Sequence, residues 1–483
     1  RPACPDDVNI HPLAAAPEGE SDPDPCAAEP GPGWPGFSCR AASTAGPVSS
    51  GVPKRRNSMA KSIESLHYFR KRHLIEYPMR ILHTADWHIG QTLNGWSRDL
   101  EHRAFLDRLQ DVILAEDVDV LLVAGDVFDG INPSGEAQRL LYGAIARMVR
   151  LRPHLQIILT AGNHDPAQRL EAPEAVLNEL GVHVLGTLRR GADGVNLDRH
   201  LIPLRDRDGA VRAYVLAVPF LRQADLPGLR LGAEDGDEPA ITAAVRALHR
   251  EMTETAVARA GGLPLVAMGH LTCSGGLASD GAERRILIGG EHAVPPDVFP
   301  PALAYVALGH LHRPQSLDGG RVRYSGSAFP LSASEIAYDH GVTLIDVSDG
   351  MSHRHIPIDR PVPMFRLPRS GSGKLEDVLA ALAEISLSPD TPRDTQPFLY
   401  LSLMADRPVT MLAAEIETLM ERTPARLAGL SITRSDQPAQ ERPPATLAET
   451  SPEDLFLSVF QEVHGIPPDA HHLAAFRDAL SEA

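Results

Sequence analysis

The sequence has few cysteines and no long apolar run. Its 483 residues include only four cysteines and no CxxC pair, which excludes a disulfide framework and a thiolate zinc site. It also lacks the run of about 18 apolar residues that a transmembrane helix needs, and no signal-peptide segment occurs near the start. We therefore expect a cytoplasmic protein in a reducing compartment, without membrane association.

Positive charge is also scarce. Lys and Arg total 46 against 63 Asp and Glu, which gives a formal net charge of −17 at pH 7. A simple nucleic-acid-binding module normally carries a basic face, so this balance argues against one. The length and an apolar fraction of 43% predict instead two or three globular domains with buried cores.

Residues 1–78 differ in composition from the rest of the chain. Up to about Val52 they are rich in Ala, Pro, Gly and Ser without helical or strand periodicity, and a basic patch, 54–56, follows. Such a segment buries too little apolar surface to offset its ordering entropy. We expect it to be disordered or to lie upstream of the natural start, with Met79 as the candidate first residue. A targeting or DNA-contacting tail is the alternative.

From Met79 onward, apolar runs of strand length alternate with amphipathic stretches of helix length. The βαβαβ order at the start predicts parallel strands whose carboxyl ends gather along one rim. We expect residues 79–360 to form a layered α/β sandwich whose second half is built mainly of strands. The predicted strands are Arg80–His83, Asp119–Ala124, Gln156–Thr160, Ala213–Val218, Leu265–Met268, Tyr305–Leu308 and Gly341–Asp346, and the predicted helices are His102–Ala115 and Ser134–Arg150.

A smaller α+β unit is expected at residues 361–434, where we place a capping domain. A polar linker, 435–450, precedes C-terminal helices at 451–483, which open with the helix-start sequence Ser-Pro-Glu-Asp. The apolar stripe of that helix could pack on the chain's own capping domain or dock on a partner. The predicted elements of the small unit are helices Leu375–Ile385 and Val409–Thr423 with strands Phe398–Met404 and Arg426–Thr433, and the stripe consists of Leu455, Phe456, Val459 and Phe460.

Five short polar motifs occur in order, each directly after an apolar strand. Strands hold such side chains rigidly, and the Asp-x-His and His-x-His spacings let two of them converge from one loop. Carboxylate, imidazole and amide groups without thiolates suit Mn²⁺, Fe²⁺ or Zn²⁺. Any one motif could be an ordinary turn, but their co-occurrence indicates a metal site. The motifs are Asp86-Trp87-His88, 125–129 (GDVFD), 162–165 (GNHD), Gly269-His270 and 309–312 (GHLH).

This ordered set resembles the calcineurin-like metallophosphoesterase superfamily. The resemblance implies two divalent ions, most readily Mn²⁺, which together activate a water and neutralise phosphate charge. By it, His164 faces the leaving oxygen as a general acid or stabilises the transition state, and the Asp129 carboxylate orients His164. The implied ligands are Asp86, His88 and His312 for one ion, Asn163, His270 and His310 for the other, and Asp126 bridging both.

Longer segments resemble the SbcD family, bacterial nuclease subunits that act on DNA in replication, recombination and repair. They include 82–91, 123–129, 217–222, 268–272, 307–313 and 324–327, and the resemblance extends to the C-terminal helices. It implies double-strand exonuclease and single-strand endonuclease activity, and a homodimer within a heterotetramer. It also implies that the C-terminal helices dock on an SbcC-type coiled-coil ATPase. An acidic subunit gains little from counterion release alone, which favours such a partner.

Two other functions could use the same residues. One is a phosphatase or small-molecule phosphodiesterase with the same two metals, and the other is a non-catalytic scaffold. Protein phosphatases of the superfamily follow the second acid with Arg-Gly, whereas here Gly130 and Ile131 follow Asp129. Every expected site position holds a residue that can bind a metal ion or act in catalysis. A non-catalytic scaffold would not need this, so it is the less favoured alternative.

Deleting residues 1–78 should leave the melting temperature and metal-dependent activity of the chain essentially unchanged, because that segment has no periodic apolar pattern to pack. Differential scanning calorimetry of the full and shortened chains checks this. A large fall in melting temperature would show that the segment belongs to the fold.

Overall fold

A computed structural model describes residues 78–191, 194–226, 238–279, 293–347 and 350–434, together with six separate positions nearer the C-terminus. Those six are Phe456, Leu457, Phe460, Pro468, His472 and Leu473. The expectations for the N-terminal segment, the linker at 435–450 and most of 451–483 therefore fall outside the described residues.

Two six-stranded sheets form the body of the chain. In the first sheet β1 pairs antiparallel with β15 and parallel with β4, and the parallel series continues through β5 to β6. In the second, β10, β11 and β12 are parallel neighbours. The order of the first sheet is β16 (Met351–Pro357), β15 (Gly341–Val347), β1 (Met79–Thr84), β4 (Val120–Ala124), β5 (Gln156–Thr160) and β6 (Val182–Leu185). The order of the second is β13 (Gln315–Leu317), β14 (Val322–Tyr324), β12 (Leu303–Gly309), β11 (Leu265–His270), β10 (Val211–Ala217) and β9 (Leu201–Arg205).

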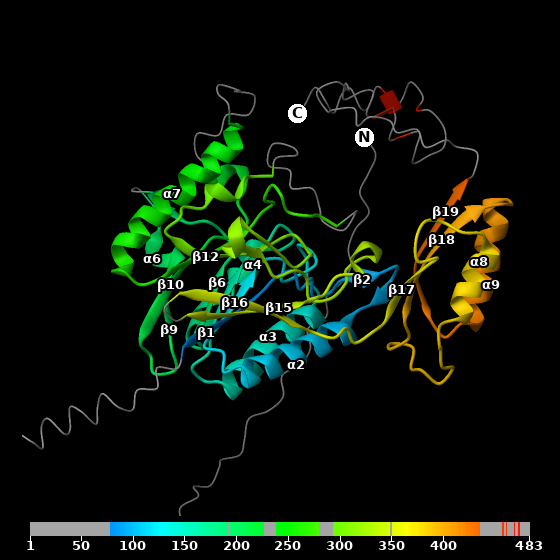
Figure 1. The fold of residues 1–483 in the computed structure, drawn as a ribbon, viewed down its shortest axis with the longest axis horizontal. Coiled ribbons are helices and arrows are strands. Elements are labelled where there is room, and N and C mark those ends of the chain that lie inside the picture. The colour runs from blue at the N-terminus through cyan, green and yellow to red at the C-terminus, as the bar shows by residue number, and fades with distance from the viewer. Residues whose placement is uncertain are drawn as a thin grey trace, which may run out of the picture. The chain divides into compact units, whose positions relative to one another are not determined.

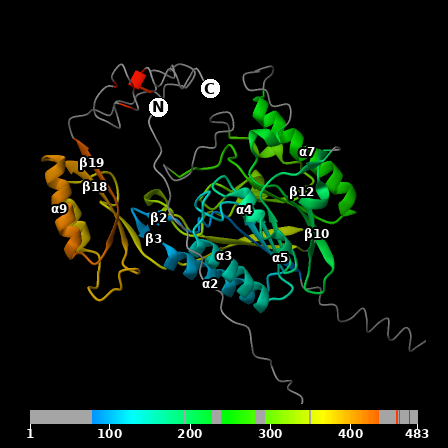
Figure 2. The same cartoon turned by 180° about the vertical axis from the view of Figure 1, so that it is seen from behind.

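The sheets pack face to face with helices on their outer sides. Alternate residues of β1 show the layering, because Ile81 joins the core between the sheets and Leu82 joins the core under the helices. Helices α2 (Asp99–Ala115) and α3 (Gly135–Leu151) cover the first sheet, and α7 (Ala240–Ala260) covers the second. Figures 1 and 2 show α2 and α3 side by side and α7 on the opposite side of the sandwich. The predicted layered α/β sandwich is confirmed.

Local sequence accounts for the start of α3. Ser134 has extended backbone, and its hydroxyl accepts a hydrogen bond from the Ala137 amide, as predicted for an N-cap. The helix then buries an apolar face with Leu140, Leu141 and Ile145 against the first sheet. The strand β4 that precedes it is wholly buried, so a rigid strand and a capped helix flank the loop 125–134.

A three-stranded parallel sheet with two helices follows residue 363, and we call it the C-terminal sheet unit, 364–434. Its helices α8 and α9 pack with β18 and β19 around their own apolar core, which contains Leu401, Leu412 and Ile416. The strands are β17 (Met364–Leu367), β18 (Phe398–Ala405) and β19 (Arg426–Arg434), and the helices are α8 (Leu375–Ala383) and α9 (Val409–Arg422). The two predicted helices and two predicted strands are present, whereas β17 was not predicted.

A hairpin near the first motif contacts this unit. The hairpin consists of β2 (Thr92–Leu93) and β3 (Trp96–Ser97), and the indole of Trp96 donates a 3.0 Å hydrogen bond to the Leu427 carbonyl. Leu93 joins an apolar cluster with Val362, Met364 and Phe398. Side-chain burial therefore links the loop after β1 to the C-terminal sheet unit.

Helix α7 was also not predicted. Its apolar residues Ile241, Val245, Leu248, Met252 and Ala256 recur at helical spacing and are all buried, so the signal was present in the sequence. Within the described part of the chain, no helix combines the length and apolarity needed to span a membrane.

The remaining short elements are the helices α4 (Ala167–Glu171), α5 (Glu174–Asn178) and α6 (Leu197–His200), the hairpin β7 (Arg190–Gly191) and β8 (Gly194–Val195), and the 3₁₀ turns η1 (Gln223–Asp225), η2 (Pro296–Val298), η3 (Asp318–Gly320) and η4 (Ala333–Glu335).

Candidate metal centre

The predicted site residues lie at or just after the carboxyl ends of β1, β4, β5, β11 and β12. Backbone hydrogen bonds hold the first two loops together: the Asp86 amide donates to the Gly125 carbonyl and the His88 amide to the Asp126 carbonyl, each at 3.0 Å. The His310 amide, just after β12 of the second sheet, donates to the Asp86 carboxylate at 3.0 Å, so strand ends from both sheets meet at one rim.

The backbone at four of these positions is in the left-handed region. Asp86, His88, Asp126 and His310 have φ values of 52°, 45°, 50° and 98°. Such values are uncommon for residues other than glycine and cost free energy, so the surrounding structure must stabilise them. Their concentration at one rim is typical of a functional site.

Two motif glycines leave room for this arrangement. At Gly162, an added Cβ would overlap the Asp126 carboxylate, and at Gly125, where φ is +88°, it would overlap the His270 ring. A side chain at either position would therefore displace one of the predicted ligands.

One group of predicted ligands consists of Asp86, His88 and His312. Their ligand atoms all lie within 4.8 Å of one another, and the three residues are buried. The buried Nε2 of His88 has no hydrogen-bond partner, although burying an unpaired polar atom is costly. An ion bound by this group would satisfy that atom.

A second group consists of Asp126, His270 and His310, and Asn163 lies beside it. The Asn163 Oδ1 atom is 3.0 Å from His270 Nε2 and 3.2 Å from His310 Nδ1. Asp126 Oδ2 lies 3.2 Å from His270 Nε2 and 3.6 Å from His88 Nε2, so its carboxylate reaches both groups. The donors are carboxylate, imidazole and amide groups, which fit two divalent ions such as Mn²⁺.

Burial and neighbouring charges perturb the protonation of these groups. Burial raises the pKa of Asp86 and lowers that of His310 well below its ordinary value. Burial alone would lower the pKa of His270, but the adjacent Asp126 carboxylate raises it to about 9. For Asp126, burial acts upward and is outweighed by His270, so its pKa is lowered. The raised pKa values of Asp86 and His270 favour bound protons at these two groups, and a cation bound at the rim would take the place of those protons.

His164 lies at the edge of the first group. Its amide donates a 2.8 Å hydrogen bond to Asp126 Oδ1, and its ring stands edge-on to His88 with centroids 4.7 Å apart. The His164 Nδ1 atom is 2.8 Å from the Asp129 carbonyl oxygen, and because a carbonyl only accepts, that nitrogen carries the proton.

Asp129 contacts the His164 ring through its main chain as well as lying beside it with its carboxylate. The carboxylate was expected to orient His164, and the main-chain carbonyl makes a 2.8 Å contact with the ring in addition. Carboxylate Oδ1 lies 3.2 Å from His88 Nδ1, and the side chain is 40% exposed. A carboxylate oxygen still lies within 4.8 Å of ring nitrogens of both His88 and His164. The sequence motif could not distinguish a main-chain contact from a side-chain contact.

Two buried carboxylates that were not predicted support these loops. Asp165 accepts hydrogen bonds from the amides of Gly162, Val127 and Phe128, which joins the second and third motif loops. Burial raises its pKa to about 6. Glu335 accepts a 2.9 Å hydrogen bond from His312 Nδ1. Asp165 could have been suspected from its place in the third motif, whereas Glu335 lies outside every motif.

Comparisons with known proteins show the family of the chain. A family profile described as calcineurin-like phosphoesterase matches residues 79–314, and one described as type 5 capsule protein repressor C-terminal domain matches 360–464. The SbcD subunit of the SbcCD nuclease of Rhodobacter capsulatus is 70% identical over 384 residues, covering 79% of this chain and 94% of that protein. The chain belongs to the SbcD family.

Other members of the SbcD family are more distant. The SbcD protein of Escherichia coli K12 is 31% identical over 391 residues, 78% of this chain and 92% of that protein. That of Bacillus subtilis is 35% identical over 278 residues, 56% of this chain and 67% of that protein. With the metallophosphoesterase fold, this membership identifies a nuclease, a hydrolase of phosphodiester bonds whose fold works with divalent metal ions.

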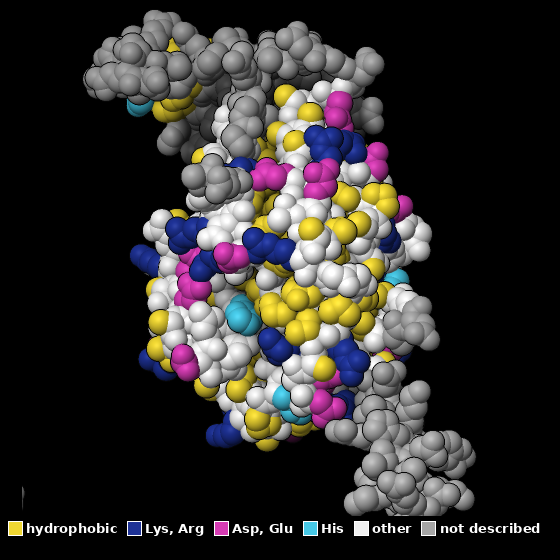
Figure 3. All heavy atoms as spheres, turned by 90° about the vertical axis from the view of Figure 1, so that its left-hand side faces the viewer, with side chains coloured by type: hydrophobic (Ala, Val, Ile, Leu, Met, Phe, Trp, Pro, Cys, Tyr) yellow, Lys and Arg dark blue, Asp and Glu magenta, His cyan; other side chains and the backbone are white. Residues whose placement is uncertain are grey.

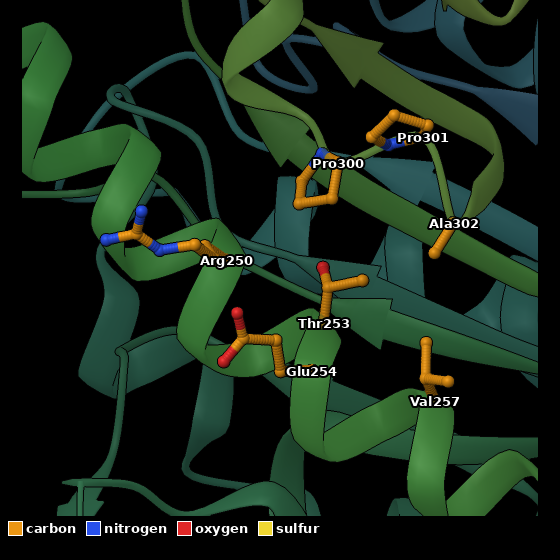
Figure 4. Close-up of a pocket in the computed structure, with 7 residues that line it drawn as sticks. All are labelled: Arg250, Thr253, Glu254, Val257, Pro300, Pro301 and Ala302. Atoms are coloured by element: carbon orange, nitrogen blue, oxygen red, sulfur yellow. The ribbon is translucent and has the colours of Figure 1, made fainter.

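A separate hollow of about 340 Å³ lies between α7 and the loop that precedes β12. Figure 4 shows Arg250, Glu254 and Val257 on the helix facing Pro300 and Pro301. The lining contains none of the predicted site residues, so it has no part in the chemistry described here.

Replacing His88 or His270 with Ala should each remove about one of two bound ions, because the two residues lie in different groups. Inductively coupled plasma mass spectrometry of Mn²⁺-loaded protein measures the content. His249→Ala, a buried histidine in α7, is the matched control and should keep both ions. Unchanged metal content in both site variants would contradict the ligand groups.

His164→Ala should keep both ions and lose turnover by roughly 10²–10⁴, the usual contribution of general acid–base catalysis. Single-turnover rates on a DNA substrate, measured beside metal content, check this. Loss of an ion in this variant would make His164 a ligand instead.

Proposed function

We propose that the chain is the DNA-cleaving subunit of a complex with an SbcC-type coiled-coil ATPase, and that it works with two Mn²⁺ ions in the cytoplasm, where bacterial DNA lies. The observation that carries this is the rim where two adjacent ligand groups share Asp126 in a chain 70% identical to an SbcD nuclease subunit. The proposed activities are double-strand exonuclease and single-strand endonuclease.

We assign Asp86, His88 and His312 to one ion, Asn163, His270 and His310 to the other, and Asp126 to both. When bound, two such ions would lower the pKa of a water molecule and neutralise charge on the phosphate during in-line displacement. The chain orients these groups through its backbone: the His310 amide donates to the Asp86 carboxylate at 3.0 Å and the His164 amide to Asp126.

His164 is assigned to the leaving oxygen. When doubly protonated, its Nδ1–H remains on the Asp129 carbonyl and its Nε2–H is donated to the departing oxygen. Because the Asp129 contact comes from the main chain, it holds the ring whatever the protonation state of the carboxylate. Asp129 thereby acts as a positioning residue for His164, and its carboxylate supports His88.

We further propose a division of labour along the chain. Residues 79–360 form the nuclease domain, 361–434 a capping domain, 435–450 a linker and 451–483 helices that dock on the ATPase, with two copies in a heterotetramer. The net negative charge of the chain supports the proposal that its binding to DNA depends on the ATPase partner. Figure 3 shows basic and acidic side chains interspersed on one face, and the whole chain has a net charge of −17.

The docking proposal rests on the stripe near the C-terminus. Phe456 and Phe460 are helical and half-buried, and their ring centroids are 5.6 Å apart, as expected for side chains one helical turn apart. Phe460 also lies 4.7 Å from the ring of His472, so one side of the stripe packs on the chain itself. The profile match extending to residue 464 includes both phenylalanines.

The activity is tested with purified chain and Mn²⁺ on single-stranded DNA, on duplex ends and on a phosphomonoester, with and without the ATPase subunit. We expect metal-dependent cleavage of single-stranded DNA by the chain alone and duplex cleavage that depends on the ATPase. Faster hydrolysis of the phosphomonoester than of DNA would favour the phosphatase alternative.

Changing Phe456 and Phe460 together to Ser should abolish co-purification with the ATPase subunit, because the apolar stripe would no longer enter a partner groove. Cleavage of single-stranded DNA by the isolated chain should survive. Met411→Ser, which changes an exposed apolar residue of α9, is the control and should leave co-purification intact. A double variant that still co-purifies, or that unfolds, would show that the stripe is internal core.

A further inference from the structure

A fully buried glutamate lies against the proposed metal centre although it belongs to none of the motifs. Glu335 ends the 3₁₀ turn η4 (Ala333–Glu335), 23 residues after His312, and its side chain is 0% exposed. Its Oε1 atom is 2.9 Å from His312 Nδ1. A carboxylate seldom occupies a fully buried position unless partners stabilise it there.

The chain holds this carboxylate in place from several sides. Oε2 accepts a 2.8 Å hydrogen bond from the Leu331 amide and a 3.4 Å bond from the Ser327 hydroxyl. The Ser332 hydroxyl lies 3.4 Å from Oε1. The Ser327 amide in turn donates to the His312 carbonyl at 3.1 Å, so the loop 325–335 wraps around His312. The loop itself therefore fixes the position of the Glu335 carboxylate.

The hydrogen bond between His312 and Glu335 determines which nitrogen of His312 faces the other ligands. A carboxylate oxygen accepts hydrogen bonds, so the proton of His312 lies on Nδ1 toward Glu335. Nε2 then presents its lone pair to the group that contains Asp86 and His88. A carboxylate behind a ligating imidazole also increases the basicity of the ring and fixes its orientation.

Two other histidines of the centre, His270 and His88, have weaker support on the same ring atom. His270 Nδ1 donates to the Ala124 carbonyl at 2.9 Å, a neutral acceptor. His88 Nδ1 is 3.2 Å from the Asp129 carboxylate, which is 40% exposed and therefore screened by water. Glu335 is the one among these acceptors that is both charged and fully buried, so its effect on its imidazole is the strongest.

We propose that Glu335 is a positioning residue of the metal centre that acts through His312 on the ion shared with Asp86 and His88. The proposal rests on the assignment of His312 as a ligand. It concerns one of the two ions only, because the described hydrogen bonds of Glu335 lead to His312 and to its own loop and to no member of the second group.

The test measures Mn²⁺ binding directly, by isothermal titration calorimetry and by electron paramagnetic resonance of bound Mn²⁺. Glu335→Gln should raise the dissociation constant of one ion by roughly 10–100-fold, the usual effect of losing such a support, and leave the other nearly unchanged. Glu171→Gln is the matched control: Glu171 is a buried glutamate bonded to Gly186, Thr187, Arg189 and Arg199, and its loss should leave both constants unchanged.

A double-mutant cycle separates positioning from a general loss of structure. In a His312→Ala background, Glu335→Gln should weaken Mn²⁺ binding little further, whereas in a His270→Ala background its full effect should remain. Equal additional losses in both backgrounds, or an unchanged dissociation constant in folded Glu335→Gln, would overturn the proposal.

A conservative variant covers the case in which Glu335→Gln does not fold. Glu335→Asp keeps the charge but shortens the side chain, so it should weaken the same ion and less than Glu335→Ala does. No effect of Glu335→Asp on either ion would also overturn the proposal. Because binding is measured without DNA, failure of the nuclease assay would count against the proposed function and leave this inference standing.

Discussion

The centre depends on the burial of two carboxylates, Asp86 and Asp126, at the rim shared by the two sheets. Both are almost fully excluded from solvent, and like charges buried together are unfavourable unless positive charge or hydrogen bonds compensate them. The chain supplies backbone donors, with the His310 amide on Asp86 and the His164 amide on Asp126. Histidines surround both acids, and divalent cations would complete the neutralisation.

The same constraint explains the unusual backbone at the rim. Turning an amide toward a buried carboxylate requires the loops to curl directly after each strand, and four ligand positions adopt positive φ to do so. Asp165 pins two of these loops by accepting three amide hydrogen bonds. The strands beneath these loops are almost wholly buried, and their packing offsets the unfavourable free energy of the strained loops.

A buried arginine extends this rigidity toward the C-terminal sheet unit. Arg98 forms a two-pronged ion pair with Glu101 and donates to the Pro330 carbonyl at 2.7 Å, next to the loop that holds Glu335. Its guanidinium lies 4.4 Å from the Phe329 ring centroid and 5.7 Å from that of Phe398 in β18. Arg98 therefore contacts both the loop 325–335 and the C-terminal sheet unit.

Much of this architecture could be read from the sequence, because its signals are local. Strand-length apolar runs predicted the strands that precede the motifs, and Ser134 predicted the start of α3. The alternation of strands and helices indicated a layered α/β sandwich, and the order of the motifs indicated the family. The motif spacing also placed the ligand types at strand ends. Helix α7 was not predicted, although its apolar periodicity is visible in the sequence.

Other features were decided by the tertiary structure alone. The contact of His164 with the Asp129 main chain depends on how two loops meet, which no spacing encodes. The pairing of Glu335 with His312 depends on the path of the chain between them, 23 residues apart, and on the burial of their loop. Sequence by itself determined which residues end each strand, because periodicity and turn chemistry act over a few neighbours. Which atoms of distant residues meet was decided only when both sheets packed together, because burial and hydrogen-bond geometry act through space.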